Sequence, residues 1–253
     1  MTDKQRPADG YRFVILPTVG STNKLLADLA ARGAADGTVV IARQQRAGRG
    51  RRGREWVSPP GNLYMSILLR PDLPAAIGGQ IGFVAGLAVA ETLAQRVEGR
   101  TISLKWPNDV LVDGRKICGL LAEATVEGDR LAHIVLGIGI NLVSAPTEDV
   151  RWPTVALADY GAAPRDPIDF AAGLTRRLQR WLDIWMGEGF APVRAAWVGR
   201  AWGLGRDFQT EAEGGTISGR FDGIDADGAL VLESAGGGRR LIRSGEVFPA
   251  EAS

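Results

Sequence analysis

Short apolar segments alternate with longer amphipathic ones through the first three quarters of the chain. Continuous or alternating apolar runs predict strands over residues 11–17, 37–45, 63–70 and 101–106, and over two arms of 115–142 around a turn at 127–129. Helical spacing predicts helices over 21–33, 77–97 and 167–189. In the last helix one apolar stripe is expected to be core; it consists of Leu174, Leu178, Trp181 and Trp185.

The pattern changes at about Gly205. From there the chain holds short alternating segments that are separated by glycine-rich turns, which is typical of a small all-β barrel. We therefore predict an α+β protein with a larger domain over residues 1–204 and a small β-barrel domain over 205–253.

The composition excludes several classes of function. The 253 residues include 30 Lys and Arg against 29 Asp and Glu, so the chain lacks the basic excess of a general nucleic-acid binder. The one cysteine, Cys118, and the one histidine, His133, cannot supply the four ligands of a structural zinc site. His133 lies in an apolar strand and is expected to be core. No apolar run of membrane-spanning length and no signal peptide is evident, so we expect a cytoplasmic protein without a membrane partner.

Residues 48–54 read GRGRRGR, with glycines at the spacing of the dinucleotide-binding fingerprint. That motif needs a helix directly after the glycines, whereas Pro59, Pro60 and Gly61 follow here. Two interpretations remain. The segment is a solvated basic loop, or it is a mobile loop that closes on an anion, because the arginine fork donates two parallel bonds to a phosphate.

The segment KWPNDV, residues 105–110, places an Asn-Asp pair just after a strand that ends at a proline. Asn108 and Asp109 are good turn residues. The Asp109 carboxylate could equally orient a substrate amine or hold a magnesium ion.

The segment RKICGLLAE, residues 115–123, opens an apolar strand with a lysine. Regular alternation puts Lys116 on one face with Cys118 and Leu120, and Gly119 on the other face with Ile117. Lys116 is then either a charge at the strand edge or an ammonium that points into a ligand site.

The segment GIGIN ends the second long strand, and Gly137, Gly139 and Asn141 share one of its faces. Glycines weaken a strand unless something must approach its backbone closely. They predict either a ligand floor that ends in an amide donor or tight packing of the sheet against a helix.

Taken in order, STN, QQRAGRGRRGREW, KWPNDV, KICGLLAE and GIGINL resemble the biotin–protein ligase family, densely over residues 11–142 and more loosely in the barrel. The resemblance implies a mixed-sheet catalytic domain of the biotin/lipoate ligase type followed by an SH3-like barrel. It implies that biotin and ATP form biotinyl-5′-adenylate, with Mg²⁺, and that biotin then passes to a lysine of a biotin carboxyl carrier domain. Because the first strand lies near the N-terminus, we expect no DNA-binding helix-turn-helix domain and no DNA partner.

Residue by residue, the resemblance assigns the biotin site to Ser21, Thr22, Asn23, Gln45, Arg49, Gly50, Arg51, Lys116 and Gly119. It assigns the ATP site to Arg51, Arg54, Trp56, Asn108, Asp109, Lys116 and Asn141. Lys116, Arg51 and Asp109 are the expected catalytic residues, and Asp109 is the expected metal ligand. Lys116 would bridge the biotin carboxyl oxygen and the α-phosphate, and residues 48–54 would order over the adenylate.

The chemistry agrees with this composition. Both half-reactions build negative charge on oxygens, and such reactions need placed cations and donors rather than a protein nucleophile. Closure of the glycine–arginine loop would exclude water from a mixed anhydride.

Three alternatives are open on the sequence. A lipoate–protein ligase uses the same adenylate chemistry for another acyl group, although it typically lacks the GRGRRGR loop. A biotin-responsive DNA-binding repressor and a non-catalytic ligand-binding protein are the others. The sequence allows either a monomer or a homodimer.

Overall fold

The computed structural model describes residues 10–148, 150–212, 215–234 and 236–250. A seven-stranded sheet with the order β1-β2-β3-β7-β6-β5-β4 organises the first part of the chain. Its strands are β1 Arg12–Leu16, β2 Thr38–Ala42, β3 Leu63–Leu69, β4 Ile102–Lys105, β5 Asp109–Val112, β6 Arg115–Glu127 and β7 Arg130–Ile140. β1 and β2 are parallel and the other neighbours are antiparallel, which confirms the mixed sheet that the family resemblance implies.

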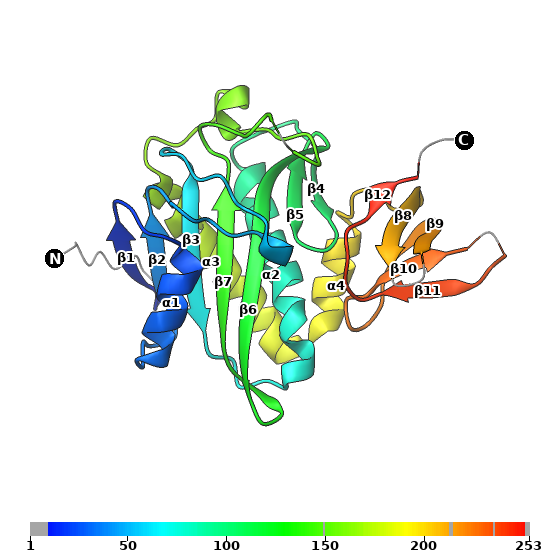
Figure 1. Ribbon diagram of the computed structural model, residues 1–253, viewed down its shortest axis with the longest axis horizontal. Helices are drawn as coiled ribbons and strands as arrows, with labels where there is room; N and C mark the ends of the chain where they lie inside the picture. The colour runs from blue at the N-terminus through cyan, green and yellow to red at the C-terminus, as the bar shows by residue number, and fades with distance from the viewer. Residues whose placement is uncertain (1–9, 149, 213–214, 235, 251–253) are drawn as a thin grey trace.

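One helix covers part of the front face of this sheet. α1, Thr22–Ala31, connects β1 to β2, and the Ser21 side chain caps it by accepting from the Lys24 N–H. Its residues Leu26 and Ala30 pack against apolar side chains of β2, β3 and β7. Over β5 and β6 this face is covered by no α-helix of the described chain, and only the short 3₁₀ turn Arg51–Gly53 lies in front of it (Figure 1).

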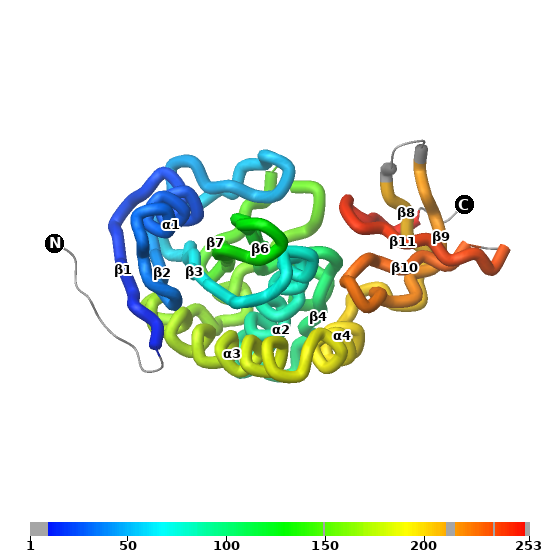
Figure 2. Tube along the Cα trace, turned by 90° about the horizontal axis from the view of Figure 1, so that it is seen from below, coloured from blue at the N-terminus to red at the C-terminus, as the bar shows by residue number. Residues whose placement is uncertain are grey.

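The back face holds the main core. α2, Ile81–Ala94, α3, Pro167–Glu188, and α4, Phe190–Val198, all lie behind the sheet (Figures 1 and 2). The four residues of the predicted α3 stripe are buried there, as expected. The segment Ala75–Ala94 has the length and hydropathy of a membrane span, yet 72% of its most apolar 18-residue stretch is buried inside this protein, as in a core helix.

The C-terminal part forms a second, five-stranded antiparallel sheet with the order β11-β10-β9-β8-β12. Its strands are β8 Asp207–Ala212, β9 Gly215–Ile224, β10 Leu230–Glu233, β11 Arg239–Ile242 and β12 Phe248–Pro249. Trp106 Nε1 donates to the Gly228 carbonyl at 3.1 Å, and Arg194 Nε donates to the Ile224 carbonyl at 2.6 Å. These bonds attach the second sheet beside β4 and α4 (Figure 1). The boundary at 204/205 stays a prediction.

His133 is not the core residue that the sequence indicates. It is half-buried on β7 and its ring nitrogen Nε2 lies 3.1 Å from Thr125 Oγ1. The β6–β7 hairpin extends beyond the helices at this end (Figure 1). Its side chains there are therefore not packed under a helix as those in the rest of the sheet are. Burial, followed by the nearby charge of Arg70, still lowers the pKa of His133.

Candidate active site

A cavity of about 490 Å³ lies over the half of the sheet that α1 leaves open. β6 and β7 contribute its floor, the start of α1 forms one wall, and Glu246 and Phe248 of the C-terminal part line the opposite side. The glycine–arginine loop passes in front of β6 (Figure 1). Every residue that the sequence assigns to the biotin or ATP site lines this cavity. The separate motifs therefore meet in one place, while the individual roles stay predictions.

Glycines in the floor let other groups reach the strand backbones. A Cβ on Gly139 would stand 2.6 Å from Trp56 Cε2, and a Cβ on Gly119 would stand 2.8 Å from Trp56 Cζ3. The Trp56 indole thus lies against β6 and β7, where a larger residue would displace it. A Cβ on Gly137 would collide with the side-chain amide of Asn23. Gly137 therefore serves packing against α1, whereas Gly119 and Gly139 make room for a ring.

A chain of hydrogen bonds joins the start of α1 to the loop. The N–H and the hydroxyl of Thr22 both donate to Gln45 Oε1, at 2.8 and 3.1 Å. Gln45 Nε2 donates to Ser58 Oγ at 3.0 Å, and the Ser58 hydroxyl donates to the Trp56 carbonyl at 2.7 Å. These bonds set the orientation of the Gln45 amide and hold the end of the loop.

A second branch leaves the same helix start and reaches the other end of the loop. Ser66 Oγ on β3 lies 2.8 Å from Thr22 Oγ1 and 2.5 Å from Asn23 Oδ1. Asn23 Nδ2 donates to Glu123 Oε2 at 2.8 Å, and Glu123 Oε1 pairs with Arg49 Nη1 at 3.3 Å. The two branches thus connect Arg49 to Trp56 through the residues that the sequence assigns to the biotin head.

Lys116 reaches the cavity because β6 is bulged. Consecutive residues of β5 pair with Cys118 and then with Lys116, so Ile117 is an extra residue in β6. The alternation expected from the sequence is therefore wrong here. Lys116 shares its face with Gly119, whose Cβ position lies 3.5 Å from Lys116 Cε, while Ile117 and Cys118 are both buried in the core with Leu120.

The Lys116 ammonium is held between a carboxylate and a ring. Its Nζ lies 2.7 Å from Asp109 Oδ1 and 5.4 Å from the centroid of the Trp56 ring. Asp109 is the first residue of β5, a strand that was not predicted from the sequence. Of the Asn-Asp pair, therefore, only Asn108 lies in the turn that precedes this strand. The sequence pattern misses β5 because it has only four residues and directly follows the turn of KWPNDV.

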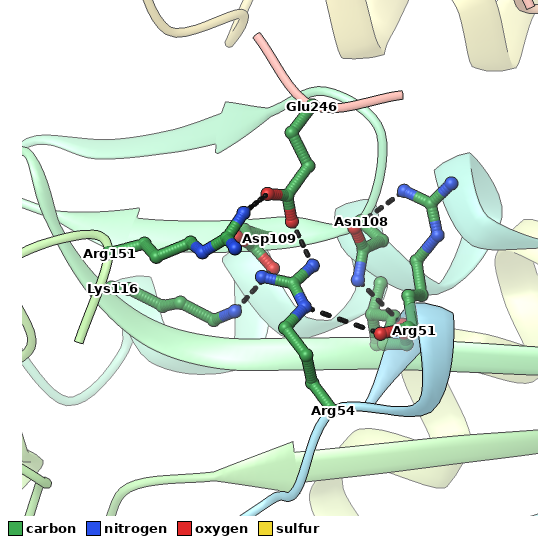
Figure 3. A network of polar contacts seen from close by, with 8 residues as sticks. Arg51, Arg54, Asn108, Asp109, Lys116, Arg151 and Glu246 are labelled. Atoms are coloured by element: carbon green, nitrogen blue, oxygen red, sulfur yellow. Dashed lines mark hydrogen bonds and ion pairs between the residues drawn. The ribbon is translucent and has the colours of Figure 1, made fainter. Parts of the chain in front are cut away.

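Arg54 of the loop lies beside this ion pair, and Arg51 points toward the neighbouring Asn108 (Figure 3). Arg51 lies in a 3₁₀ turn, Arg51–Gly53, where Arg52 adopts the left-handed conformation with φ of 57°. Arg51 Nη1 donates to Asn108 Oδ1 at 3.1 Å. Burial, followed by the charge of Arg52, lowers the pKa of Arg51, so this guanidinium sits in a site that already carries excess positive charge.

Glu246 of the C-terminal part reaches into this group. Its two carboxylate oxygens bind two cations: Oε1 pairs with Arg54, and Oε2 lies 3.3 Å from Arg151 Nη1 (Figure 3). Arg54 Nε also donates to the Arg51 carbonyl at 3.3 Å. A carboxylate from the connection between β11 and β12 thus pairs with both the loop and Arg151.

Among the residues that line or support the cavity and were not assigned from the sequence are Ser66, Lys105, Glu123, Arg151 and Glu246. Lys105 and Glu123 belong to the segments KWPNDV and RKICGLLAE, so their place beside other site residues was a usable signal. Arg151 and Glu246 lie in segments without a recognisable spacing. Only the tertiary structure brings those two residues to the loop.

Comparison with known proteins agrees with this geometry. Residues 15–141 match the biotin/lipoate A/B protein ligase family, and residues 207–248 match the biotin protein ligase C-terminal domain. The chain is 38% identical to the biotin--[acetyl-CoA-carboxylase] ligase of Paracoccus denitrificans, over 92% of this chain and 99% of that protein. It is 35% identical to the bifunctional ligase/repressor BirA of Escherichia coli, over 94% of this chain and 76% of that protein.

A similar solved structure is that of a biotin protein ligase from Aquifex aeolicus in complex with biotin and ATP. It matches with a TM-score of 0.79 and 29% sequence identity, over 95% of this chain and 99% of that chain. A point mutant of the same protein, in complex with biotin, matches with a TM-score of 0.80 and 28% identity, over 95% of this chain and 98% of that chain. The likeness extends over both sheets.

Proposed function

Because this chain belongs to the biotin/lipoate A/B protein ligase family, we infer that it attaches biotin to a lysine of a biotin carboxyl carrier domain, using ATP and a biotinyl-5′-adenylate intermediate. One observation carries this proposal: a single cavity is lined by a polar cluster that suits an ureido group, by glycines of β6 and β7, and by the cations Lys116 and Arg51. A protein that only bound biotin would not need the cations.

The start of α1 suits the ureido head of biotin. Gln45 Oε1 already accepts two hydrogen bonds from Thr22. The amide nitrogen of Gln45 donates one N–H to Ser58, so its second N–H is available for a ligand oxygen. The Thr22 hydroxyl has a lone pair left for a ligand N–H. An ureido group offers one carbonyl acceptor and two N–H donors, so it matches this mixed set of partners.

Lys116 is well placed for the first half-reaction. The biotin carboxylate attacks the α-phosphorus of ATP, and the bond to the β-phosphate breaks as pyrophosphate leaves. Negative charge grows on the oxygens around phosphorus, and the Lys116 ammonium, held by Asp109 at 2.7 Å, would stabilise it. Arg51, bound to Asn108, would hold the phosphate side of the anhydride.

The second half-reaction needs the adenylate to be kept from water. The loop covers the cavity and is tied down at Arg49, Arg54 and Trp56. The lysine amine of the carrier then attacks the biotinyl carbonyl, and AMP leaves with the electrons of the broken C–O bond. The amine loses a proton in this step, and Asp109 is the nearest candidate carboxylate to Lys116 to receive it.

We propose that Mg²⁺ enters with the nucleotide. The described residues contain no cluster of three or more His, Cys, Asp or Glu that could hold a metal by themselves. Magnesium is usually held by one or two carboxylates together with phosphates and water, and Asp109 offers one carboxylate beside the cations. When bound, the ion would neutralise phosphate charge. Chelation with EDTA should therefore abolish adenylate formation without unfolding the protein.

A lipoate–protein ligase is the second candidate, because the family includes both activities. The named relatives and the solved complexes favour biotin. The deciding experiment measures pyrophosphate release from ATP with biotin or with lipoate, and then the mass of a carrier domain after incubation with the protein, ATP and magnesium. We expect a gain of one biotin. Release driven by lipoate and not by biotin would overturn the proposal.

We further propose that the protein acts in the cytoplasm, where ATP is available, and that it does not bind DNA. The balance of 30 basic and 29 acidic residues supports the second point, since DNA binding depends on excess positive charge. A gel-shift assay with biotin and ATP present tests it, and a shifted band that competitor DNA removes in a sequence-dependent way would contradict it.

A further inference from the structure

Lys105 is the one lysine or arginine that is buried among the described residues. It ends β4 and only 6% of it is exposed. Its ammonium makes no hydrogen bond or ion pair with any residue that the structure describes. Burial of an unpaired charge is costly, and such a group is usually paired or neutralised. An unpaired ammonium that lines a cavity therefore indicates a missing anionic partner.

Two aromatic rings hold this ammonium in place. Lys105 Nζ lies 4.7 Å from the centroid of the Trp152 ring and 5.6 Å from that of the Phe248 ring. The faces of aromatic rings attract a cation without neutralising it. Phe248 comes from β12 and Trp152 from the segment before α3, so parts far apart in the sequence build this position around one charge.

The electrostatic surroundings are strongly positive. The charges of Lys116, Arg54 and Arg51 act on Lys105 and are opposed by Asp109 alone. Burial is the first cause that lowers the pKa of Lys105, to about 8, and these cations add to it. With Arg151 and Glu246, which also line this part of the cavity, five cations stand against two carboxylates, and this excess attracts a ligand with several negative charges.

The order of the site residues across the sheet indicates where this anionic ligand would bind. The polar cluster lies at α1 and β3, Lys116 on β6, Asp109 on β5 and Lys105 on β4, which are successive positions in the strand order. In phosphoryl transfer the attacking and leaving oxygens lie roughly in line through phosphorus. A carboxylate that comes from the α1 side and reacts beside Lys116 would expel its leaving group toward β4.

We propose that Lys105 binds the pyrophosphate group of ATP, opposite the attacking carboxylate, and stabilises it as it leaves. This inference rests on the proposed function. As the α-phosphorus–oxygen bond breaks, its electron pair stays on the departing pyrophosphate, and no proton needs to move. The ammonium of Lys105, kept free of protein anions, meets that growing charge.

The test uses the reverse reaction, with inorganic pyrophosphate as the probe. Purified protein is given biotinyl-5′-adenylate and increasing pyrophosphate, and the ATP that forms is measured. In Lys105→Met, which keeps the length and removes the charge, we expect the KM for pyrophosphate to rise at least about tenfold, as loss of a charge-assisted contact does. In Lys105→Arg, which keeps the charge, the KM for pyrophosphate should stay within about threefold of the wild-type value. Arg32→Met, an exposed cation outside the cavity, should behave as the wild type.

A second readout separates this role from a structural one. Transfer of biotin from preformed adenylate to a carrier domain involves no pyrophosphate, so Lys105→Met should leave that rate within about twofold. Its melting temperature should rise, because a buried unpaired charge is gone. If Met is not tolerated, Lys105→Gln serves in the same assays. An unchanged KM for pyrophosphate, or an equal loss in both half-reactions, would overturn the inference. A wild type without pyrophosphorolysis of the adenylate would overturn the proposed function itself.

Discussion

Arg54 and Glu246 form an ion pair although 192 positions separate them in the sequence. Arg54 belongs to the glycine–arginine loop and Glu246 to the connection between β11 and β12. The Glu246 side chain is 17% exposed and also binds Arg151. The loop that covers the cavity is therefore fastened by the C-terminal part of the chain as well as by the domain that carries the loop.

The first prediction concerns this fastening. Glu246→Gln removes the charge that holds Arg54, so proteolysis at Arg51 or Arg52 in the ligand-free protein should accelerate about two- to fivefold, the effect of a partly exposed pair. Biotin with ATP should slow the cleavage in both proteins. Glu233→Gln breaks the Arg220 pair within the second sheet and is the matched control. Cleavage rates that are equal in Glu246→Gln and in the control would show that the pair does not hold the loop.

The second prediction concerns retention of the adenylate. Arg51→Gly removes the guanidinium that Asn108 positions. Loss of a desolvated charge-assisted contact, about 1.5–3 kcal/mol, should raise the off-rate of the adenylate roughly 10- to 150-fold. Carrier labelling should fall while labelling of albumin rises, with Arg51→Lys in between. Labelling of the carrier alone, with no free adenylate in solution, would contradict the role of this loop.

The third prediction concerns Lys116. Lys116→Ala should slow adenylate formation by on the order of 10²–10³, as loss of one stabilising donor does. From the sequence alone this substitution is not expected to lower stability, because a lysine at a strand end contributes little. The structure predicts a loss of stability. The side chains of Lys116 and Asp109 are only 21% and 14% exposed, so the alanine variant leaves a nearly buried carboxylate unpaired. We expect the free energy of unfolding to drop by about 1–3 kcal/mol.

The double variant Lys116→Ala/Asp109→Asn is the control for that cost. It should regain most of the lost unfolding free energy in urea titrations, because no unpaired charge remains. It should not regain adenylate formation. A single Lys116→Ala variant that is folded and forms adenylate at the wild-type rate would refute the catalytic role.

The fourth prediction concerns the hydrogen-bonded branch through Ser66. Ser66→Ala removes the hydroxyl beside Thr22 and Asn23 and leaves Asn23 Oδ1 without that partner. Loss of the hydrogen bond that orients these two groups, worth about 0.5–1.5 kcal/mol, should raise the KM for biotin about two- to tenfold and change the KM for ATP little. Ser103→Ala is the matched control, since Ser103 Oγ is buried without a hydrogen-bond partner in the described structure. Equal rises in both KM values would indicate general disruption.

The fifth prediction concerns pH and Lys105. The pKa falls from 10.5 to about 8, chiefly through burial, with Arg51, Arg54 and Lys116 adding to it and Asp109 opposing. Between these two values the unfolded chain binds more protons than the folded one, so this residue makes stability rise with pH. The stability advantage of Lys105→Met should be full below about pH 8 and shrink by about 3 kcal/mol by pH 10.5. An advantage that is constant from pH 7 to 10.5 would contradict the lowered pKa.

Much of this protein was predictable from its sequence because the signals are local. Ser21 caps α1 where a capping residue precedes an apolar period, and the α3 stripe recurs at helical spacing. The motif residues were also predictable, since contiguous segments such as STN and KWPNDV carry them. Each of these depends on neighbours only a few positions away.

Other features depend on contacts between distant segments, and only the tertiary structure decided them. One extra residue at Ile117, set by how β6 pairs with β5 and with residues 153–155, turns Lys116 from the core face to the cavity. Glu246 meets Arg54, and Phe248 meets Lys105, because the second sheet packs beside β4. Burial of Lys105 follows from the same packing. Strand register and the packing of the two sheets are sums over many weak contacts, so no short pattern in the sequence records them.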